Sequence, residues 1–241
     1  MTGAQLGLLN VSSGFHYGAQ LGLTNIGVRG LTGAQLGLLN VIAGPAHGAQ
    51  LGLVNVSTER EHGVLLGLLN VAQNADAAIG LVNVIWRGRT QLDAWATDAG
   101  LFMLGVEHGA RLTHNIYAIG VKPMSGAPAL SAALGFGFRV VSAEPISLDI
   151  DLLSYSLLRK EVDRSRFDFG AIHQLRVPLS ISLIRGVAIF IAPTLSVSVA
   201  QRDSNLGGDL ALYKSTRLTR SAQSDWQVRI WPGLSLGLRF F

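Results

Sequence analysis

Seven charged residues in the C-terminal half have the spacing that could support chemistry. They lie on the polar faces of segments in which apolar and polar residues alternate, and they are Arg139, Arg176, Arg229, Arg239, Asp149, Asp151 and Asp168. Unpaired charges in a confined, poorly hydrated space are costly. We therefore predict that these side chains face a common interior, where they pair with one another or line a channel for small solutes.

The spacing of potential nucleophiles and bases does not indicate a catalytic site. Ser180, His173 and Asp149 form a conceivable triad for lipid hydrolysis, but nothing in their spacing separates them from ordinary interior polar residues. The six histidines form no HxxxH or HExxH pattern, and the chain has no cysteine. We predict no catalytic residue, no metal site and no cofactor.

The segments that must position these charges have the alternation of long β-strands. Leu130–Val140, Val187–Val199 and Trp226–Phe240 each place aliphatic and aromatic residues on one face and small or polar residues on the other. A period of two indicates a strand rather than a helix. Ordinary strands have about 5 to 6 residues, whereas membrane strands need about 9 to 11 with this alternation. A soluble β-sandwich or lipocalin-like barrel is the alternative.

Composition favours contact with something other than water. Only 14% of the residues are charged, against about 25% in an average soluble protein. No apolar run approaches the roughly 20 residues of a membrane helix, so a closed β-barrel is the membrane fold left open. The net charge of +4 comes mainly from arginine without a basic cluster, which argues against nucleic-acid binding.

The N-terminal part repeats one motif, TGAQLGLLNV, in five copies whose starts lie 15 residues apart, with a sixth, worn copy at 77–84. Stacked in parallel as a solenoid, the copies would place their amide side chains in two ladders. One ladder would contain Asn10, Asn25, Asn40, Asn55, Asn70 and Asn83, and the other Gln5, Gln20, Gln35 and Gln50. Such ladders stabilise stacked strands; in this arrangement the leucines would point inward.

An antiparallel meander, with one strand in each copy, is the arrangement that we favour from sequence. A bulge at Gly7 would bring Gln5 and Asn10 to the interior face. Charge is concentrated in alternate spacers, as expected if alternate turns lie at opposite ends. We therefore predict an all-β antiparallel transmembrane barrel of about 14 strands, with repeats at 1–88 and long strands at 89–241. The alternative is an N-terminal β-solenoid followed by an eight-stranded barrel.

The chain ends in GLSLGLRFF, which resembles the C-terminal assembly signal of bacterial outer-membrane barrels. Leu236, Leu238 and Phe240 supply the alternation, Gly237 the glycine and Phe241 the terminal aromatic residue. The resemblance implies that the barrel-assembly machinery recognises this strand. The aromatic residues Trp86, Trp95, Tyr117, Tyr155, Trp226 and Trp231 are candidates for the membrane interface.

The repeats, together with the segment HNIYAIGVKP at 114–123, resemble a bacterial family of surface repeat-containing proteins with GxQxGLxNxA repeats. The resemblance covers residues 3–123 by motif and implies an exported, envelope-associated protein without an assigned catalytic residue. Because Met1 leads directly into a repeat, we expect that a signal sequence has been lost upstream.

These observations predict a non-catalytic protein of the bacterial outer membrane with a structural, pore-like or surface-interaction role. Its expected partners are the lipid bilayer and the barrel-assembly machinery, with small solutes or an envelope protein as further candidates and no nucleic acid. The alternatives are a membrane-embedded lipid hydrolase and a soluble β-solenoid adhesion module.

Overall fold

The structure, a computed structural model, describes residues 1–124, 127–161, 166–201, 206, 215–218 and 226–241. All regular elements in these ranges are β-strands. They form an 11-stranded sheet system and a 10-stranded sheet, and no pairing among the described residues joins the two. The chain divides into a first unit of Met1–Thr90 with His108–Asn115 and a second unit of Gln91–Glu107 with Ile116–Phe241. The described residues include no helix with the length and apolarity needed to cross a membrane.

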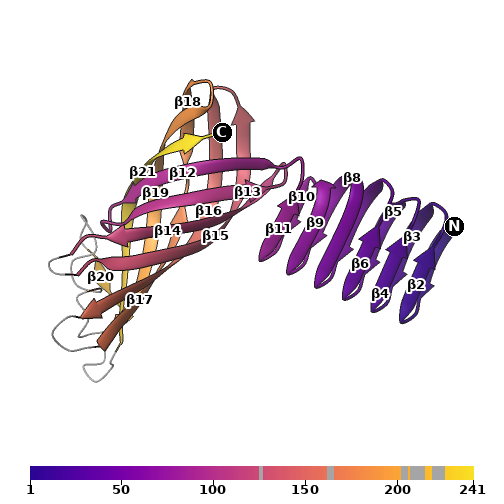
Figure 1. Cartoon of the computed structure of the whole chain (residues 1–241), viewed down its shortest axis with the longest axis horizontal. Coiled ribbons are helices and arrows are strands. Elements are labelled where there is room, and N and C mark those ends of the chain that lie inside the picture. The colour runs from indigo at the N-terminus through magenta and orange to yellow at the C-terminus, as the bar shows by residue number, and fades with distance from the viewer. Residues whose placement is uncertain (125–126, 162–165, 202–205, 207–214, 219–225) are drawn as a thin grey trace. The chain divides into compact units, whose positions relative to one another are not determined.

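The first unit is a stack of β-coils in which each repeat copy supplies two short strand segments (Figure 1), and β8 contains the second segment of the fourth copy and the first segment of the fifth. The strands are β1 (Thr2–Leu6), β2 (Leu9–Ser12), β3 (His16–Leu21), β4 (Thr24–Gly27), β5 (Leu31–Leu36), β6 (Leu39–Ile42), β7 (Ala46–Leu51), β8 (Val54–Leu66), β9 (Leu69–Asn74), β10 (Ala77–Ile79) and β11 (Val82–Ile85). Strands of successive copies pair in parallel, with Gln5 opposite Gln20 and Asn10 opposite Asn25.

The predicted antiparallel meander is therefore wrong, as is the single barrel of about 14 strands. A corner at Gly7 and Leu8 divides the first copy into β1 and β2, and strands of this length are too short to cross a bilayer. Gln5 and Asn10 face the coil interior from two different sheets, so no bulge is needed. Because the spacers stack in register, they all lie on one edge of the first unit. The alternation of charge between spacers therefore does not place alternate turns at opposite ends.

Glycine at two places in each of the first five copies allows the coils to stack closely. Gly33 has φ +138°, and a Cβ atom there would lie 1.9 Å from the carbonyl oxygen of Gly18 in the coil before. At the corner, a Cβ atom on Gly37 would lie 2.4 Å from the Gly22 carbonyl oxygen. A side chain at either place would separate the coils, since only glycine combines this conformation with such a close approach.

The amide ladders predicted for the solenoid alternative are present. Asn25 Nδ2 donates to Asn40 Oδ1 at 2.9 Å, and Gln35 Nε2 donates to Gln20 Oε1 at 2.7 Å. The two ladders run in opposite donor directions. The leucines of the motif, in contrast, point outward, with Leu38 53% exposed. Each coil thus has its amides inside and its leucines outside.

A segment that is distant in sequence covers the last coil of the first unit. Asn83 Nδ2 donates to Asn115 Oδ1, and Asn115 Nδ2 donates to the Gly80 carbonyl oxygen at 2.8 Å. Thr113 Oγ1 both accepts from the Ala78 amide and donates to the Ala78 carbonyl. Asn115 therefore continues the asparagine ladder and caps the array, which is the role that terminal segments have in repeat proteins.

The second unit is an antiparallel sheet of long strands. These are β12 (Arg89–Thr97), β13 (Phe102–Gly109), β14 (Thr113–Lys122), β15 (Ala129–Ala143), β16 (Ile146–Glu161), β17 (Arg166–Arg176), β18 (Leu179–Ile184), β19 (Val187–Gln201), β20 (Thr216–Arg217) and β21 (Trp226–Phe240). Pairings connect β12 through β13, β14 and β15 to β16, then through β17 and β19 to β21, and β21 also pairs with β12.

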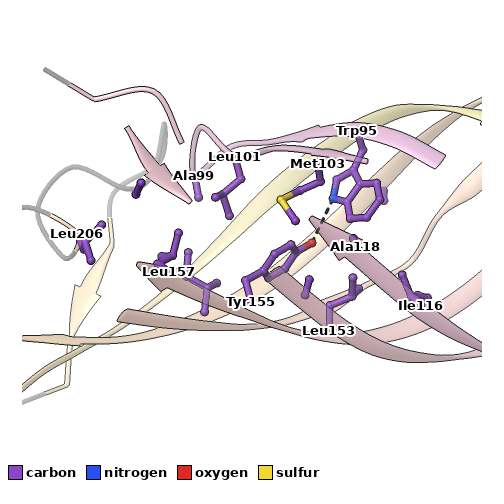
Figure 2. Packing of buried hydrophobic residues seen from close by; sticks show 14 of the residues in the cluster. Trp95, Ala99, Leu101, Met103, Ile116, Ala118, Leu153, Tyr155, Leu157 and Leu206 are labelled. Atoms are coloured by element: carbon purple, nitrogen blue, oxygen red, sulfur yellow. Dashed lines mark hydrogen bonds between the residues drawn. The ribbon is translucent and has the colours of Figure 1, made fainter. Parts of the chain in front are cut away.

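The alternation predicted for the long strands is confirmed, and its two faces differ sharply in exposure. On β15, Leu134 is 54% exposed and Phe138 44%, whereas their sequence neighbours Ala133 and Arg139 are buried. The same inversion holds on β19 and β21. The buried face contains small and polar residues together with a hydrophobic cluster around Trp95, Leu153 and Tyr155 (Figure 2). Trp95, Tyr155 and Trp231 are thus interior residues, contrary to their predicted interface position.

Candidate functional site

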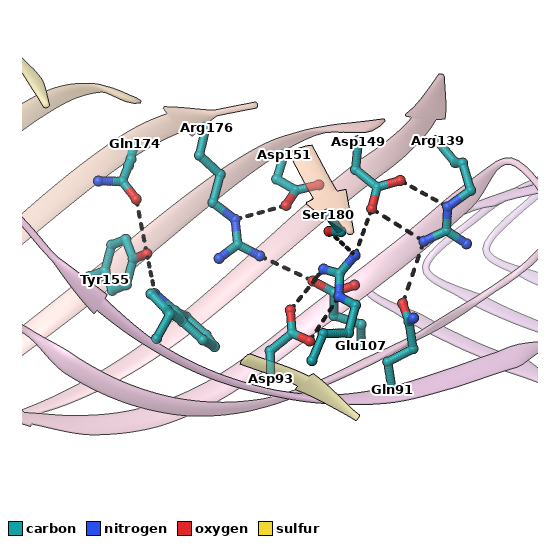
Figure 3. Close-up of polar contacts among 12 residues, drawn as sticks. Gln91, Asp93, Glu107, Arg139, Asp149, Asp151, Tyr155, Gln174, Arg176 and Ser180 are labelled. Carbon is teal, nitrogen blue, oxygen red and sulfur yellow. Dashed lines mark hydrogen bonds and ion pairs between the residues drawn. The ribbon is translucent and has the colours of Figure 1, made fainter. Parts of the chain in front are cut away.

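Seven of the buried charged side chains of the second unit gather in one network, which is the candidate functional site (Figure 3). Its members are Gln91 and Asp93 on β12, Glu107 on β13, Arg139 on β15, Asp149 and Asp151 on β16, Arg176 on β17, Ser180 on β18 and Arg239 on β21. None is more than 7% exposed. Each lies on the buried face because residues two apart along a strand share a face.

Arg239 is the centre of the network. Its Nε and Nη2 donate to the two carboxylate oxygens of Asp93 at 2.9 and 2.8 Å. Its Nη1 donates to Asp149 Oδ2 at 2.9 Å and to Ser180 Oγ at 3.4 Å, and Nη2 also donates to Glu107 Oε1 at 2.8 Å. One guanidinium thereby joins three carboxylates from three strands.

The other two arginines extend the network on either side. Arg176 donates to Asp151 Oδ2 at 2.8 Å and to Glu107 Oε1 at 3.1 Å. Its guanidinium carbon also lies 4.9 Å from the centroid of the Trp95 ring, a distance at which a cation is attracted to the ring face. Glu107 is therefore shared between Arg176 and Arg239.

Arg139 lies at the other end of the network. Its Nε donates to Asp149 Oδ1 at 2.9 Å, and its Nη2 donates to Asp149 Oδ2 at 3.3 Å and to Gln91 Oε1 at 3.4 Å. Asp149 thus bridges Arg139 and Arg239. Every guanidinium of the network contacts a carboxylate, and every carboxylate contacts a guanidinium.

A chain of neutral hydrogen bonds continues from the ion network along the interior. Trp95 Nε1 donates to Tyr155 Oη at 3.3 Å, Tyr155 Oη donates to Gln174 Oε1 at 3.1 Å, and Gln174 Nε2 donates to Ser196 Oγ at 3.1 Å. All four side chains are buried. The interior of this part of the unit is filled by hydrogen-bonded side chains.

Because these charged side chains are buried, the stability of each one depends strongly on its partners in the network. Charges removed from water interact more strongly with one another, and removing one partner leaves an uncompensated buried charge. Arg239 contacts Asp93 and Glu107 across 146 and 132 residues of sequence. The network therefore ties together strands from the beginning and the end of the unit.

The structure brings together Arg139, Asp149, Asp151, Arg176 and Arg239 of the predicted interior residues. Asp168 is also buried, but it lies opposite Arg159 near the other end of β17. Arg229 is half-buried and ten residues before Arg239 on β21, which is about 33 Å along a strand. Both therefore lie far along their strands from the network residues Arg176 and Arg239. Gln5 and Asn10 belong to the ladders of the first unit, so their predicted place in a barrel interior is wrong.

Three network residues were not predicted from sequence. Gln91 and Asp93 alternate with the exposed Leu92 on β12, and this alternation is a signal that could have identified them. Glu107 lies within β13 on the buried face. The sequence signal for Glu107 is weak, because Gly105 and Gly109 beside it resemble turn residues.

The hypothetical lipid-hydrolase triad does not form. Asp149 and Ser180 are buried and both contact Arg239. His173 lies on the exposed face of β17, between the buried Ile172 and Gln174. The imidazole therefore points to the opposite face of the sheet from the serine and the aspartate.

The chain was compared with known proteins. No protein-family model matches it, and no curated protein matches it. Among solved structures, it is similar to the N-terminal β-barrel domain of Pseudomonas aeruginosa OprF, with 10% sequence identity and a TM-score of 0.36. That match covers 64% of this chain and 100% of the OprF domain.

Proposed function

We propose that the second unit is a closed, eight-stranded β-barrel that spans a bacterial outer membrane in a structural, non-catalytic role. The observation that carries the proposal is the inverted distribution of side chains on the long strands. Apolar residues such as Leu134 and Ile191 are exposed, while arginines and aspartates are buried. This inversion is stable when hydrocarbon surrounds the sheet and is unfavourable when water does.

The strand pairings support closure. β17 and β18 act as one strand interrupted at Val177 and Pro178, because both pair with β16 on one side and with β19 on the other. Counted in this way, the eight strands follow one another and β21 returns to β12. A closed sheet leaves no unpaired strand edge in the bilayer, as a membrane requires.

The strand lengths support a transmembrane position. β15, β19 and β21 each have 15 residues, which is about 50 Å of strand. Tilted by about 45°, such a strand still crosses a hydrocarbon layer of about 25–30 Å. The bilayer and the barrel-assembly machinery are the partners that this proposal requires.

The ion network favours a structural role over an open channel. Its side chains fill the interior between β12, β16 and β21, and solute passage would require these buried pairs to separate. The pore-like and surface-interaction roles remain weaker candidates for the same unit. We propose no catalytic residue.

A charge substitution on the exposed face tests the membrane proposal. We expect Leu134→Arg to reduce insertion strongly, because arginine at the midplane of a membrane barrel costs about 2–4 kcal/mol. The control is Ile184→Arg at the end of β18, where 69% exposure and a place at the strand end predict a small effect. Insertion is measured by heat-modifiable gel migration after refolding of the full chain in detergent.

The soluble alternative predicts a different result. A side chain that faces water tolerates arginine, so Leu134→Arg would then behave like Ile184→Arg. A wild-type chain that is monomeric and fully soluble in plain buffer, without heat-modifiable migration, would overturn the membrane proposal.

The last strand is the proposed assembly signal. Leu238, Phe240 and Phe241 are 45%, 40% and 52% exposed, and Gly237 lies beneath the Phe190 ring, which would be 2.3 Å from a Cβ atom there. Deletion of Phe241 is expected to lower assembly in bacterial outer membranes while leaving refolding in detergent unchanged. Equal loss in both assays would show that Phe241 contributes to the stability of the barrel and not to its recognition for assembly.

A further inference from the structure

The first unit has an exposed apolar edge, which we name the leucine edge. It consists of the corners between the two short strands of each coil, at 6–9, 21–24, 36–39, 51–54, 66–69 and 79–82. In the inner coils Leu38, Leu53 and Leu68 are 53%, 49% and 58% exposed. No charged residue occurs in any of these corners. A continuous apolar surface of this kind marks a site of contact with a partner or a membrane.

The charged residues of the first unit lie elsewhere, in the spacers and in the segment that caps the last coil. They are Arg29, Glu59, Arg60, Glu61, Asp76, Arg87, Arg89 and Arg111. In the third coil β5 separates the two edges, and its six residues extend about 20 Å. The stack is therefore amphipathic, with the apolar corners along one edge and the charged spacers along the other.

The backbone at the leucine edge is hydrogen-bonded within the stack. In the third coil the amides of Gly37, Leu38 and Leu39 all donate to carbonyls of neighbouring coils. The Leu36 carbonyl accepts from the Gly22 amide and, at 2.9 Å, from Asn25 Nδ2. The asparagine ladder thus satisfies corner carbonyls as well as neighbouring asparagines.

The hydrogen bonds of the corner backbone are significant because a corner that faces water does not require them. A turn that faces solvent can bond its backbone groups to water, whereas a backbone group that meets hydrocarbon must be satisfied within the protein. The Leu38 carbonyl likewise accepts from the amides of Leu53 and Val54. The corners therefore combine an apolar surface with a paired backbone.

We propose that the leucine edge is a lipid-binding surface that inserts into the boundary between headgroups and acyl chains, while the charged turns stay in water. The physics is that of an amphipathic helix lying in a membrane interface, which buries its apolar face to about 5–10 Å. Here the repeated corner supplies the apolar face. The edge does not cross the bilayer, because the strand segments that meet at its corners pair over at most six residues in each coil.

The chemistry of the edge favours lipid over a protein partner. Protein interfaces carry roughly one hydrogen bond per 100–200 Å², and their strongest contacts are enriched in Trp, Tyr and Arg. The corners contain leucine, valine, isoleucine, threonine and glycine, with no aromatic or arginine side chain. The remaining protein alternative is that the leucine edge binds a second copy of the chain, and quenching of a label at the edge distinguishes this contact from lipid binding.

The absence of native cysteine allows single labels to be placed on the full chain. Leu38→Cys reports the leucine edge, Arg29→Cys the charged edge, and Thr32→Cys an exposed position between them. Leu134→Cys on β15 independently reports whether the second unit enters the bilayer. Each variant is labelled with an environment-sensitive fluorophore and reconstituted in vesicles of phosphatidylcholine and phosphatidylglycerol. Iodide then tests exposure to water, and doxyl-labelled lipid tests exposure to acyl chains.

We expect the label at position 38 to be quenched by doxyl lipid and protected from iodide, with the opposite result at position 29 and an intermediate result at position 32. Iodide quenching at position 38 equal to that at position 29 overturns the proposal. Protection from both quenchers at position 38 would assign the edge to contact between copies and also overturns it. A label in lipid at position 134 but in water at position 38 rejects only the leucine edge; the reverse rejects only the membrane barrel.

Discussion

Arg239 and Asp93 lie directly opposite each other on β21 and β12, and their side chains form a two-bond pair in the fully buried interior of the second unit. The geometry places both carboxylate oxygens within 2.9 Å of guanidinium nitrogens. Such forked pairs are the strong form of charge-assisted hydrogen bond. This pair joins the last strand of the unit to its first, and the rest of the ion network builds on it.

Replacing Arg239 is expected to destabilise the second unit severely. Arg239→Met removes the guanidinium that pairs with Asp93 and that also contacts Glu107 and Asp149. Breaking a buried pair costs about 3–5 kcal/mol. The matched control is Arg229→Met on the same strand, which is half-buried and outside the network. Guanidinium unfolding in detergent micelles measures both. The double variant Arg239→Met with Asp93→Leu should recover part of the loss; a double variant no more stable than Arg239→Met argues against the pair.

The asparagine ladder predicts a large effect of a single amide in the first unit. Asn40 Nδ2 donates to Asn55 Oδ1 and to the Leu51 carbonyl, both at 2.9 Å, and its Oδ1 accepts from Asn25. Asn40→Ala removes all three bonds in a buried site, so we expect a loss of about 3 kcal/mol in unfolding free energy. Thr32→Ala on the exposed side of the same coil is the control. Hydrogen exchange of the β6 amides measures the change, and equal exchange in the two variants contradicts the prediction.

The glycine columns predict that one methyl group disrupts the stack. In Gly48→Ala the new Cβ atom would lie 1.8 Å from the Gly33 carbonyl oxygen, at a φ of +147°. The coils on either side must then separate, and we expect loss of the circular-dichroism signal of the first unit at a lower temperature. Gly14→Ala is the matched control, because no atom lies within 4 Å of its new methyl group. Similar melting of the two variants would show that the contact is easily relaxed.

Asp98 predicts a pH dependence. It lies in the turn after β12; Trp231 Nε1 donates to its Oδ2 at 2.8 Å, and its Oδ1 has no partner among the described residues. Burial raises the pKa of Asp98 above its ordinary value, and the hydrogen bond from Trp231 opposes the rise. The folded state thus binds this proton more tightly than the unfolded chain, in which the pKa is about 3.9.

The stability that protonated Asp98 contributes in acid is therefore lost as pH rises from about 4 through the raised pKa. Asp98→Asn keeps an acceptor for Trp231 without the charge. We expect its unfolding free energy to fall less over this interval than that of the wild type. Unfolding titrations at several pH values check this; parallel curves for the two proteins would contradict the assignment to Asp98.

Local pattern alone was sufficient for part of the fold. The alternation in β15, β19 and β21 identified the strands and separated their exposed from their buried residues, because side chains on a strand alternate between its faces. It also placed Arg139, Arg176 and Arg239 on the buried face. The equal spacing of Asn25, Asn40 and Asn55 allowed the ladder to be foreseen, since stacking identical copies puts identical amides in contact.

The tertiary structure decided how the copies stack and which charges meet. Parallel coils and an antiparallel meander both satisfy the motif, and the choice rests on the corner at Gly37 and on contacts with coils 15 residues away. The tertiary structure also shows that the repeat leucines point outward. Asp93 and Glu107 join Arg239 only because strands more than 130 residues apart lie side by side. Sequence specifies the face of each side chain through local geometry, whereas the partner depends on strand order and register, which distant segments set together.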